Sequence, residues 1–508
     1  MAANQLSPGV VVQERDLTTI TSLSTANLGV LAAPFELGPV EEVVQVTSER
    51  DLVEKFGKPN DNNYEYWYTA SQFLSYGGVL KAIRVNSAAL KNGVNSGTAP
   101  LITNLDNYES SWESSNNNWN WGARTPGHKG NSIGVFVTDS GADQIAVLPA
   151  PGSGNEHEFV ADAALSASSG AAGKVFKYAL RLTVGSVVGT FTPGATTTIN
   201  IGGSQESVNV LAWDENNKKL EIGLPSGGVT GIIADGQTVT AGTNTAVIST
   251  GGIERQLYIA LNKDSIEFDG SDVVADTNST NVTVSTVRVE YNEREYLPGV
   301  KWINVAPRPG TSQTVAGQGG FRDELHVVVV DVDGGITGTS GAVLERFIGM
   351  SKASDGKTSV GETNYYVTVI KQRSNYIYWG NHETGLFSAT GTASDGNWGL
   401  TGVGRQFNLL RSSAGTTDFP GGSFTIGSKN NATFYYRLAD GVSYSVASGE
   451  YSVSSTDVES AYQLISDPES QTIDYILTGP SGVDDGTAKA KVTALTSIVE
   501  ERRDCLLF

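Results

Sequence analysis

The 508 residues include only one cysteine, two methionines and four histidines. Cys505 alone cannot form an internal disulfide, which suits a protein made in a reducing cytoplasm and is compatible with later life outside a cell. Lys and Arg number 34 against 54 acidic residues, giving a net charge of −20, and no basic run interrupts this balance. We therefore expect no surface that follows nucleic-acid phosphates.

Long apolar segments are missing as well. Nowhere do about 18 apolar residues follow one another, and the N-terminus lacks a basic segment followed by an apolar core. Neither a membrane span nor a signal peptide is indicated. The 59 glycines and 39% hydrophobic residues favour strands and turns. A chain of this length predicts several domains of roughly 100 to 200 residues each.

Patterns for metal binding are weak. No two of the histidines are spaced four residues apart, so the helical zinc motif is absent, and His157 in NEHEFV is better explained by a solvated loop. Asp331 and Asp333 in DVDGG resemble the start of a calcium loop. Leu344, the twelfth residue counted from Asp333, is not an acidic ligand, however, so we interpret the two aspartates as strand-end carboxylates that face water.

Patterns for catalysis are equally weak. GPSG at 479–482 lacks the Lys-Ser/Thr ending of a phosphate loop. Cys505 lies in the apolar CLLF and is expected to be buried. We therefore expect no enzyme, no metal and no cofactor.

The first part of the chain has an α/β pattern. A strand is predicted over 43–46, followed by a helix with Ser48 and Asp51 at capping-box spacing and with Leu52 and Phe56 on one face. A second helix is predicted in YEYWYTASQFLSYGG, and a strand in VLKAIRVN. The polar stretch 92–121 reads as a loop whose tryptophans pack on neighbouring surfaces.

The middle of the chain changes character. From about 146 to 290 it consists of short alternating runs bounded by Gly, Asn or Pro, such as TTTINIGG, SVNVLAW and KKLEIGL. This pattern predicts an inserted all-β domain, either a small barrel or a sandwich.

The last part returns to mixed patterns. FRDELHVVVVDVDGG predicts a buried strand, GAVLERFIGMS a short helix, and NYYVTVIKQRSNYIYW a long strand or bent strand pair. A helix over 456–466, the strand IDYILTG, a helix over 487–502 and the strand CLLF then imply a parallel, doubly wound sheet. The second of these helices has Ala488, Val492, Leu495 and Val499 on one face.

Because the sequence stops at Phe508 inside what reads as a buried strand, we expect it to be a truncated piece of a longer chain.

Several stretches, in this order and spacing, resemble the tail sheath proteins of contractile-tailed bacteriophages of the T-even-like myophage type. They are LSPGVVVQERD, ANLGVLAAPFELGPVEEVVQVTSERDLVEKFGKP, ASQFLSYGGVLKAIRV, ARTPGHKGNSIGV, RDELHVVVVD, IDYILTG and VEERRDCLLF.

The resemblance implies a non-enzymatic structural subunit. Such subunits polymerise as stacked hexameric rings around the tail tube and contract to drive the tube through the host envelope. The implied partners are further copies of the chain, the tail tube protein, and the baseplate and tail terminator proteins, with no nucleic-acid contact and no membrane insertion by the sheath. The implied location is the virion tail, after assembly in the cytoplasm of the host bacterium.

The resemblance also supplies a partner for the valine run near the N-terminus, which no following tight turn would fold back into a hairpin. In the family, terminal arms add strands to sheets of neighbouring subunits. A donated strand gains main-chain hydrogen bonds, and a head-to-tail contact of this kind builds a helical polymer. The implied arm strand is Ser7, Pro8, Gly9, Val10, Val11, Val12, Gln13 and Glu14, with TTITSLSTAN as a flexible tether.

The expected fold class is multidomain α/β plus β, with an α/β sheath core, an inserted all-β protrusion domain and an extended N-terminal arm. The expected segments are an arm and tether (1–22), the first part of the α/β sheath domain (23–145), the inserted β-rich outer domain (146–290), a return to the sheath domain (291–340), and an α/β core domain incomplete at its C-terminal end (341–508).

Three alternatives stay open. One is the sheath of a contractile injection or secretion system, which shares the mechanism. Another is a virion surface protein whose β domain binds host glycan, with Trp112, Trp119 and Trp121 stacking on sugars. A polysaccharide-cleaving enzyme would need a pair of carboxylates at a set separation.

Overall fold

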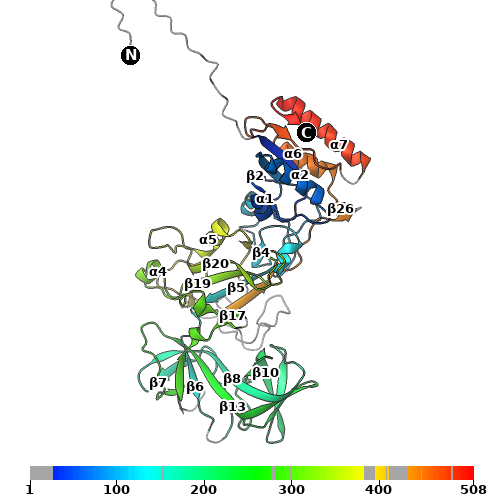
Figure 1. Ribbon diagram of the computed structural model, residues 1–508. Coiled ribbons are helices and arrows are strands. Elements are labelled where there is room, and N and C mark those ends of the chain that lie inside the picture. The colour runs from blue at the N-terminus through cyan, green and yellow to red at the C-terminus, as the bar shows by residue number, and fades with distance from the viewer. Residues whose placement is uncertain are drawn as a thin grey trace, which may run out of the picture. The chain divides into compact units, whose positions relative to one another are not determined.

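The computed structural model describes residues 27–113, 115–151, 154–275, 281–297, 299–382, 395–396, 398–407, 409–410, 433–447, 449–481 and 484–508. The fold is mixed α/β and rich in β structure. The chain forms two compact units: the part up to Ala88 joins Tyr444–Phe508, and Ala89–Ser443 forms the other unit (Figure 1). Among the described helices, none is both long and apolar enough to cross a membrane.

The first unit is built on a five-stranded sheet that combines strands from both ends of the described chain. Its order is β2 (Val43–Val46), β3 (Val79–Arg84), β1 (Leu28–Ala33), β27 (Tyr475–Ile476) and β28 (Leu506–Leu507). All neighbouring pairs are parallel except β2 with β3. The predicted parallel sheet is therefore confirmed, with one antiparallel strand at its edge.

Helices cover both faces of this sheet. They are α1 (Glu49–Phe56), α2 (Tyr64–Ser75), α6 (Ser455–Gln463) and α7 (Asp485–Arg502). Side chains alternate along β1, so that Leu31 packs with α1 and α2, whereas Val30 packs with α6 and α7. This is the double covering that the alternation of strands and helices predicted.

The predicted start of α1 is confirmed in detail. Ser48 is its N-cap, and its side chain accepts a hydrogen bond from the Asp51 N–H. The Asp51 carboxylate accepts from the Thr47 N–H in return, at 3.0 Å. Leu52 and Phe56 are buried, as their spacing predicted.

The predicted apolar face of α7 is right at Leu495, which is buried, and at Val499, which packs against the same cluster, but it is wrong at Val492. Val492 is 50% exposed, and the residues that face the sheet are Lys491, Leu495, Ile498 and Arg502. The two cations lie on this face because their stems cover apolar surface while their ends find carbonyls. Lys491 Nζ donates to Pro480 O, and Arg502 donates to Gln471 O, each at 2.8 Å.

The second unit contains a four-stranded antiparallel sheet, ordered β20 (Ala342–Ser351), β19 (Glu324–Asp331), β5 (Ile133–Asp139) and β24 (Thr433–Arg437). Two predictions fail here. GAVLERFIGMS is strand β20 and not a helix, and NYYVTVIKQRSNYIYW forms helix α5 (Tyr366–Arg373) before the short strand β21 (Ile377–Trp379). Short apolar runs are ambiguous in period, and pairing with β19 determines the state of β20.

Smaller elements complete the described part of the chain. The stretch read as a loop contains α3 (Leu105–Ser111) and β4 (Trp121–Ala123), which pairs with β21. The remaining elements are η1 (His128–Ser132), η2 (Glu290–Asn292), β17 (Glu295–Leu297), β18 (Val300–Lys301), η3 (Trp302–Asn304), α4 (Gln313–Gly317), β22 (Asp395–Gly396), β23 (Gln406–Phe407), β25 (Val446–Ala447) and β26 (Glu450–Tyr451).

The strands from β6 to β16, which we call the β domain, form one antiparallel sheet that closes partly on itself (Figure 1). Six strands make a barrel because β8 pairs with both β11 and β13. They are β8 (Ala172–Val188), β11 (Lys219–Gly223), β10 (Ser204–Asp214), β9 (Thr196–Ile201), β12 (Thr238–Ala241) and β13 (Asn244–Leu261). Apolar side chains fill the barrel, so it is a packed core rather than a binding cavity.

The two longest strands, β8 and β13, extend beyond the barrel and carry the rest of the β domain. There they pair with β7 (Ala164–Ala167) and β6 (Gln144–Leu148), and the sheet continues through β14 (Val273–Ala275), β15 (Val282–Thr283) and β16 (Thr286–Val289). A second apolar cluster, around Val175 and Leu257, lies under these strands.

Candidate functional site: a buried charged junction at the base of the β domain

The arm strand predicted over residues 7–14 lies outside the described residues. Its pairing with a neighbouring subunit therefore stays a prediction. Within the described chain, the most heavily charged buried region is the place where the chain enters and leaves the β domain.

Entry and exit lie side by side because the first and last strands of the β domain are paired. Val289 at the end of β16 is in register with Gln144 at the start of β6, and the Glu290 N–H donates to Asp143 O at 3.2 Å. We call the six residues gathered around this point the charged junction. They are Asp139, Asp143, Glu290, Arg294, Arg308 and Lys352.

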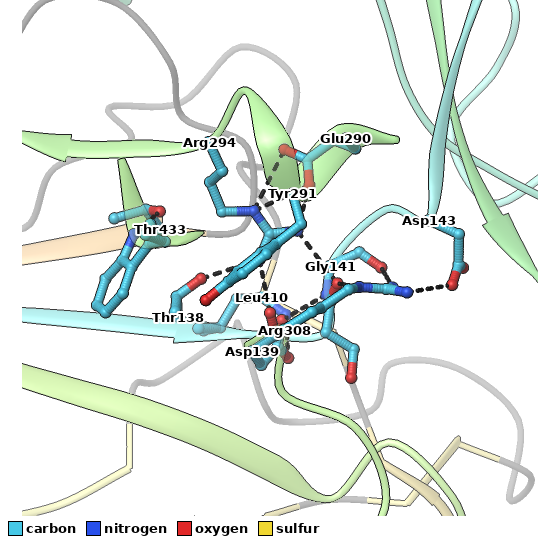
Figure 2. Close-up of polar contacts among 12 residues, drawn as sticks. Thr138, Asp139, Gly141, Asp143, Glu290, Tyr291, Arg294, Arg308, Leu410 and Thr433 are labelled. Carbon is cyan, nitrogen blue, oxygen red and sulfur yellow. Dashed lines mark hydrogen bonds and ion pairs between the residues drawn. The ribbon is translucent and has the colours of Figure 1, made fainter. Parts of the chain in front are cut away.

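Arg294 joins the segment that enters the β domain to the segment that leaves it, as Figure 2 shows. Arg294 and Glu290 are both fully buried. Arg294 Nε donates to Glu290 Oε2 at 2.9 Å on the exit side. On the entry side, Nη1 donates to Thr138 Oγ1 at 3.0 Å and to Asp139 O at 2.6 Å, and Nη2 donates to Ser140 O at 3.1 Å. One guanidinium thus ties the end of β5 to the exit from the β domain.

Asp143 makes the second connection. Its Oδ1 accepts from Arg308 Nη1 at 2.6 Å, and its Oδ2 accepts from Arg322 Nη2 and from the Leu261 N–H, each at 2.7 Å (Figure 2 shows the Arg308 contact). Leu261 is the last residue of β13. Asp143 therefore holds the end of the longest strand of the β domain against two arginines from the segment after it.

Lys352 and Asp139, both fully buried, tie the residue after β20 to the end of β5 within the four-stranded sheet. Nζ lies 2.5 Å from Asp139 Oδ2, which also accepts from the Leu410 N–H at 2.8 Å, while Oδ1 accepts from the Gly141 N–H at 2.9 Å. Burial lowers the pKa of Lys352, and the Asp139 carboxylate opposes that shift. Every oxygen of Asp139 is thus committed to a structural donor.

This arrangement suits mechanical coupling better than chemistry. The carboxylates are held by cations and backbone N–H groups, and within the described ranges no group of three or more His, Cys, Asp or Glu could hold a metal ion. Removing one partner from a buried ion pair leaves an uncompensated charge, which costs about 3–5 kcal/mol. The junction therefore holds the β domain firmly to the four-stranded sheet.

The structure also places the acidic residues that the sequence singled out. Asp331 was predicted to face water, and this prediction is wrong. The residue is fully buried, and its carboxylate accepts hydrogen bonds from the Ile336 and Thr337 N–H groups at 3.0 and 2.7 Å. It closes the turn after β19. Asp333 is exposed, as predicted, and pairs with Arg437.

The tryptophans 112, 119 and 121 pack into the protein as the loop interpretation predicted. Trp119 is 1% exposed and Trp121 is 4% exposed, while Trp112 packs against the cluster around Trp119. In the described part of the β domain, the exposed large hydrophobic side chains include no aromatic residue. Stacking of sugars on aromatic rings, which the glycan alternative requires, therefore has no support there.

Comparison with known proteins identifies the relationship of the chain. Residues 29–85 match a family model described as "Tail sheath protein Gp18 domain III N-terminal region", and this stretch contains β1, β2, α1, α2 and β3. The tail sheath protein of Salmonella phage ViI is 26% identical over 385 residues, which cover 73% of this chain and 49% of that protein. The chain is a relative of the phage tail sheath proteins.

Two further tail sheath proteins are similar over shorter stretches. That of Enterobacteria phage T4 is 33% identical over 102 residues, covering 20% of this chain and 15% of its own length. That of Vibrio phage KVP40 is 39% identical over 83 residues, covering 16% and 12%. The chain thus aligns with about half of the ViI tail sheath protein and with less of the others. Tail sheath proteins are structural components of virions and not enzymes.

Proposed function

We propose that this chain is a structural subunit of a contractile phage tail sheath, which polymerises as stacked hexameric rings around the tail tube and contracts to drive the tube through the host envelope. The observation that carries the proposal is the sheath family match over residues 29–85, together with similarity to the ViI tail sheath protein over 385 residues. The sheath of a contractile injection system shares this mechanism, but the relatives found are phage proteins.

The partners follow from this role. They are further copies of the chain, the tail tube protein, and the baseplate and tail terminator proteins, in a tail assembled in the cytoplasm of the host bacterium. The segments 1–22, 23–145, 146–290, 291–340 and 341–508 are proposed as arm, first sheath part, outer domain, second sheath part and core part.

The charged junction supports a mechanism based on rigid bodies. A contracting sleeve transmits force only if its subunits move as solid pieces between two packings. Arg294 and Asp143 fasten the entry and exit of the β domain beside the four-stranded sheet through buried and partly buried contacts, and Lys352 fixes the end of β5 next to them. We infer that the β domain follows the motion of that sheet rather than swinging on a hinge.

The arm strand 7–14 is the proposed connection between subunits. In the described part of the chain β2 is an edge strand of the five-stranded sheet, and a strand from a neighbouring copy could extend a sheet edge of this kind by main-chain hydrogen bonds. The three consecutive valines of the arm favour an extended conformation.

Deleting Met1 to Asp16 tests the proposal. We expect a folded, soluble chain with an unchanged circular dichroism spectrum that fails to join sleeves formed around tail tubes and baseplates, as seen by electron microscopy. Val10→Pro with Val12→Pro should have the same effect, because proline removes ladder donors. Thr21→Ala in the tether is the matched control and should assemble normally. A deletion variant that still polymerises and contracts would overturn the role of the arm.

A further inference from the structure

A cleft of about 390 Å³ opens beside the charged junction. The cleft is lined by the end of β13 and the loop 262–265, by residues 308–311, Ala316 and 320–322, and by Ser140 and Asp143. This volume lies at the lower end of the range for small-molecule sites and is larger than a single water needs.

The charged lining of this cleft is cationic on balance. Three cations, Lys263, Arg308 and Arg322, face two carboxylates, Asp143 and Asp264, so the lining carries 3 − 2 = +1. The chain as a whole carries −20. A positive hollow on so acidic a protein selects negative ligands from solution.

Arg322 lines this cleft and carries a buried nitrogen without an acceptor. The residue is 8% exposed, and its Nη2 is occupied by Asp143 Oδ2 at 2.7 Å and by Leu261 O. Nη1 has no hydrogen-bond acceptor among the described residues. A buried guanidinium N–H without an acceptor destabilises the protein unless a ligand or water completes it.

The neighbouring cations are also positioned for a ligand. Arg308 is fixed by Nε on Ser140 O at 2.8 Å and by Nη1 on Asp143 Oδ1 at 2.6 Å, which holds its guanidinium plane at the cleft. Lys263 is exposed, and its Nζ donates to Gly319 O at 2.9 Å and lies 5.9 Å from the centre of the Phe321 ring. An anion in the cleft could therefore bind the Lys263 ammonium group by replacing a single hydrogen bond, the one to Gly319 O.

We propose that this cleft binds an oxyanion, a carboxylate or a phosphate, between Arg322, Arg308 and Lys263. Planar guanidinium groups match the oxygens of such anions. Arg322 Nη1 lacks a hydrogen-bond acceptor, and an oxyanion would supply one. The anion is either free in solution or an acidic side chain of a second copy, of which this chain offers 54. The inference does not depend on the proposed sheath function.

The test is titration of the whole chain with inorganic phosphate and with glutarate, against sodium chloride at equal ionic strength. Calorimetry and thermal unfolding report binding, and sedimentation velocity reports association between copies. We expect saturable binding of phosphate or glutarate, with a midpoint of unfolding that rises as the site fills.

Three variants locate the site. Arg322→Gln and Lys263→Gln should each weaken binding, by about tenfold for the buried arginine because a charge-assisted contact is lost. Lys263 is exposed, so its variant tests the site even if Arg322→Gln does not fold. Lys357→Gln, an exposed lysine outside the cleft lining, is the matched control and should bind like the wild type.

The outcomes separate the sources of the anion. If the chain self-associates, and if phosphate reverses and Lys263→Gln abolishes this association, the anion is a carboxylate of a second copy. Binding without a change in sedimentation assigns it to a free anion. Absence of saturable binding together with no cleft-dependent association, or equal weakening by Lys357→Gln, would overturn the proposal and leave water as the partner of Arg322.

Discussion

At the scale of single residues, the buried charges of the junction are the features that most constrain the second unit. Arg294 satisfies Glu290 and three oxygens on the entry side of the β domain, Thr138 Oγ1 and the carbonyls of Asp139 and Ser140. These groups are separated by about 150 positions in the sequence, yet a single side chain satisfies them all. Such a contact contributes to specificity because a lysine or an apolar residue cannot reproduce its geometry.

Arg294→Met is therefore expected to be severely destabilising. It leaves Glu290 buried without its cation, and we expect the free energy of unfolding to fall by about 3–5 kcal/mol in urea titrations. The double variant Glu290→Gln with Arg294→Met should recover part of this loss because the uncompensated charge is gone.

Arg373→Met is the matched control for this change. Arg373 pairs with Glu362 at 3.4 Å, and both side chains are more than half exposed. An exposed pair of this kind contributes less than about 1 kcal/mol. Equal losses for the variants at 294 and 373 would contradict a special role for the junction.

The buried His326 and the half-buried His382 make stability depend on pH. His326 Nε2 donates to Pro307 O at 2.8 Å, and its Nδ1 accepts from the Gly349 N–H at 3.0 Å, so the ring is neutral in the fold. Burial lowers the pKa of His326 below 6.5, and burial lowers the pKa of His382 to about 4. Below 6.5 the unfolded chain binds protons that the folded chain excludes.

The free energy of unfolding should therefore fall as the pH decreases from about 6.5 toward 4, and it should be regained above 6.5. Thermal unfolding at pH 7.5 and 5.5 measures this. His326→Gln should reduce the difference between the two midpoints, whereas a variant of the exposed His128, His128→Gln, should keep it. An unchanged difference in both variants would contradict the assignment to His326.

At the scale of elements, prediction from sequence succeeded where several local signals agreed. α1 combined a cap, an acidic first turn and an apolar face, and it begins where these signals placed it. GAVLERFIGMS offered only a short apolar run, and its strand state depends on pairing with β19, which no local pattern encodes. The face of α7 was predicted only in part, because Lys491 and Arg502 count as polar although their stems are buried.

The N-cap of α1 gives a prediction at this scale. Ser48→Ala removes the acceptor for the Asp51 N–H, and we expect a loss of about 1 kcal/mol in the free energy of unfolding. Ser497→Ala on the exposed side of α7 is the control, since Ser497 Oγ donates only to Thr493 O within its own helix. That variant should be neutral or slightly stabilising. A similar loss at both positions would show that the cap contributes nothing specific.

At the scale of the whole molecule, alternation of apolar residues was sufficient to predict an all-β region, and six of its strands form a closed barrel. The charged junction could not be predicted in the same way. Glu290 and Arg294 are spaced four apart in EYNER, and charged residues in so short a pattern usually lie on a solvated face, so nothing in it indicates burial. Their burial follows from the pairing of β16 with β6, a contact between residues far apart in the chain.

Electron cryo-microscopy of purified particles with extended and contracted tails tests the central proposal most directly. We expect this chain in the sleeve around the tail tube in both states, with the β domain facing outward and with the Arg294 and Asp143 contacts unchanged while subunits move relative to one another. Absence of the chain from the sleeve, or its location in a fibre or adhesin, would contradict the proposed function. A β domain that swings on the junction between the two states would contradict the rigid coupling.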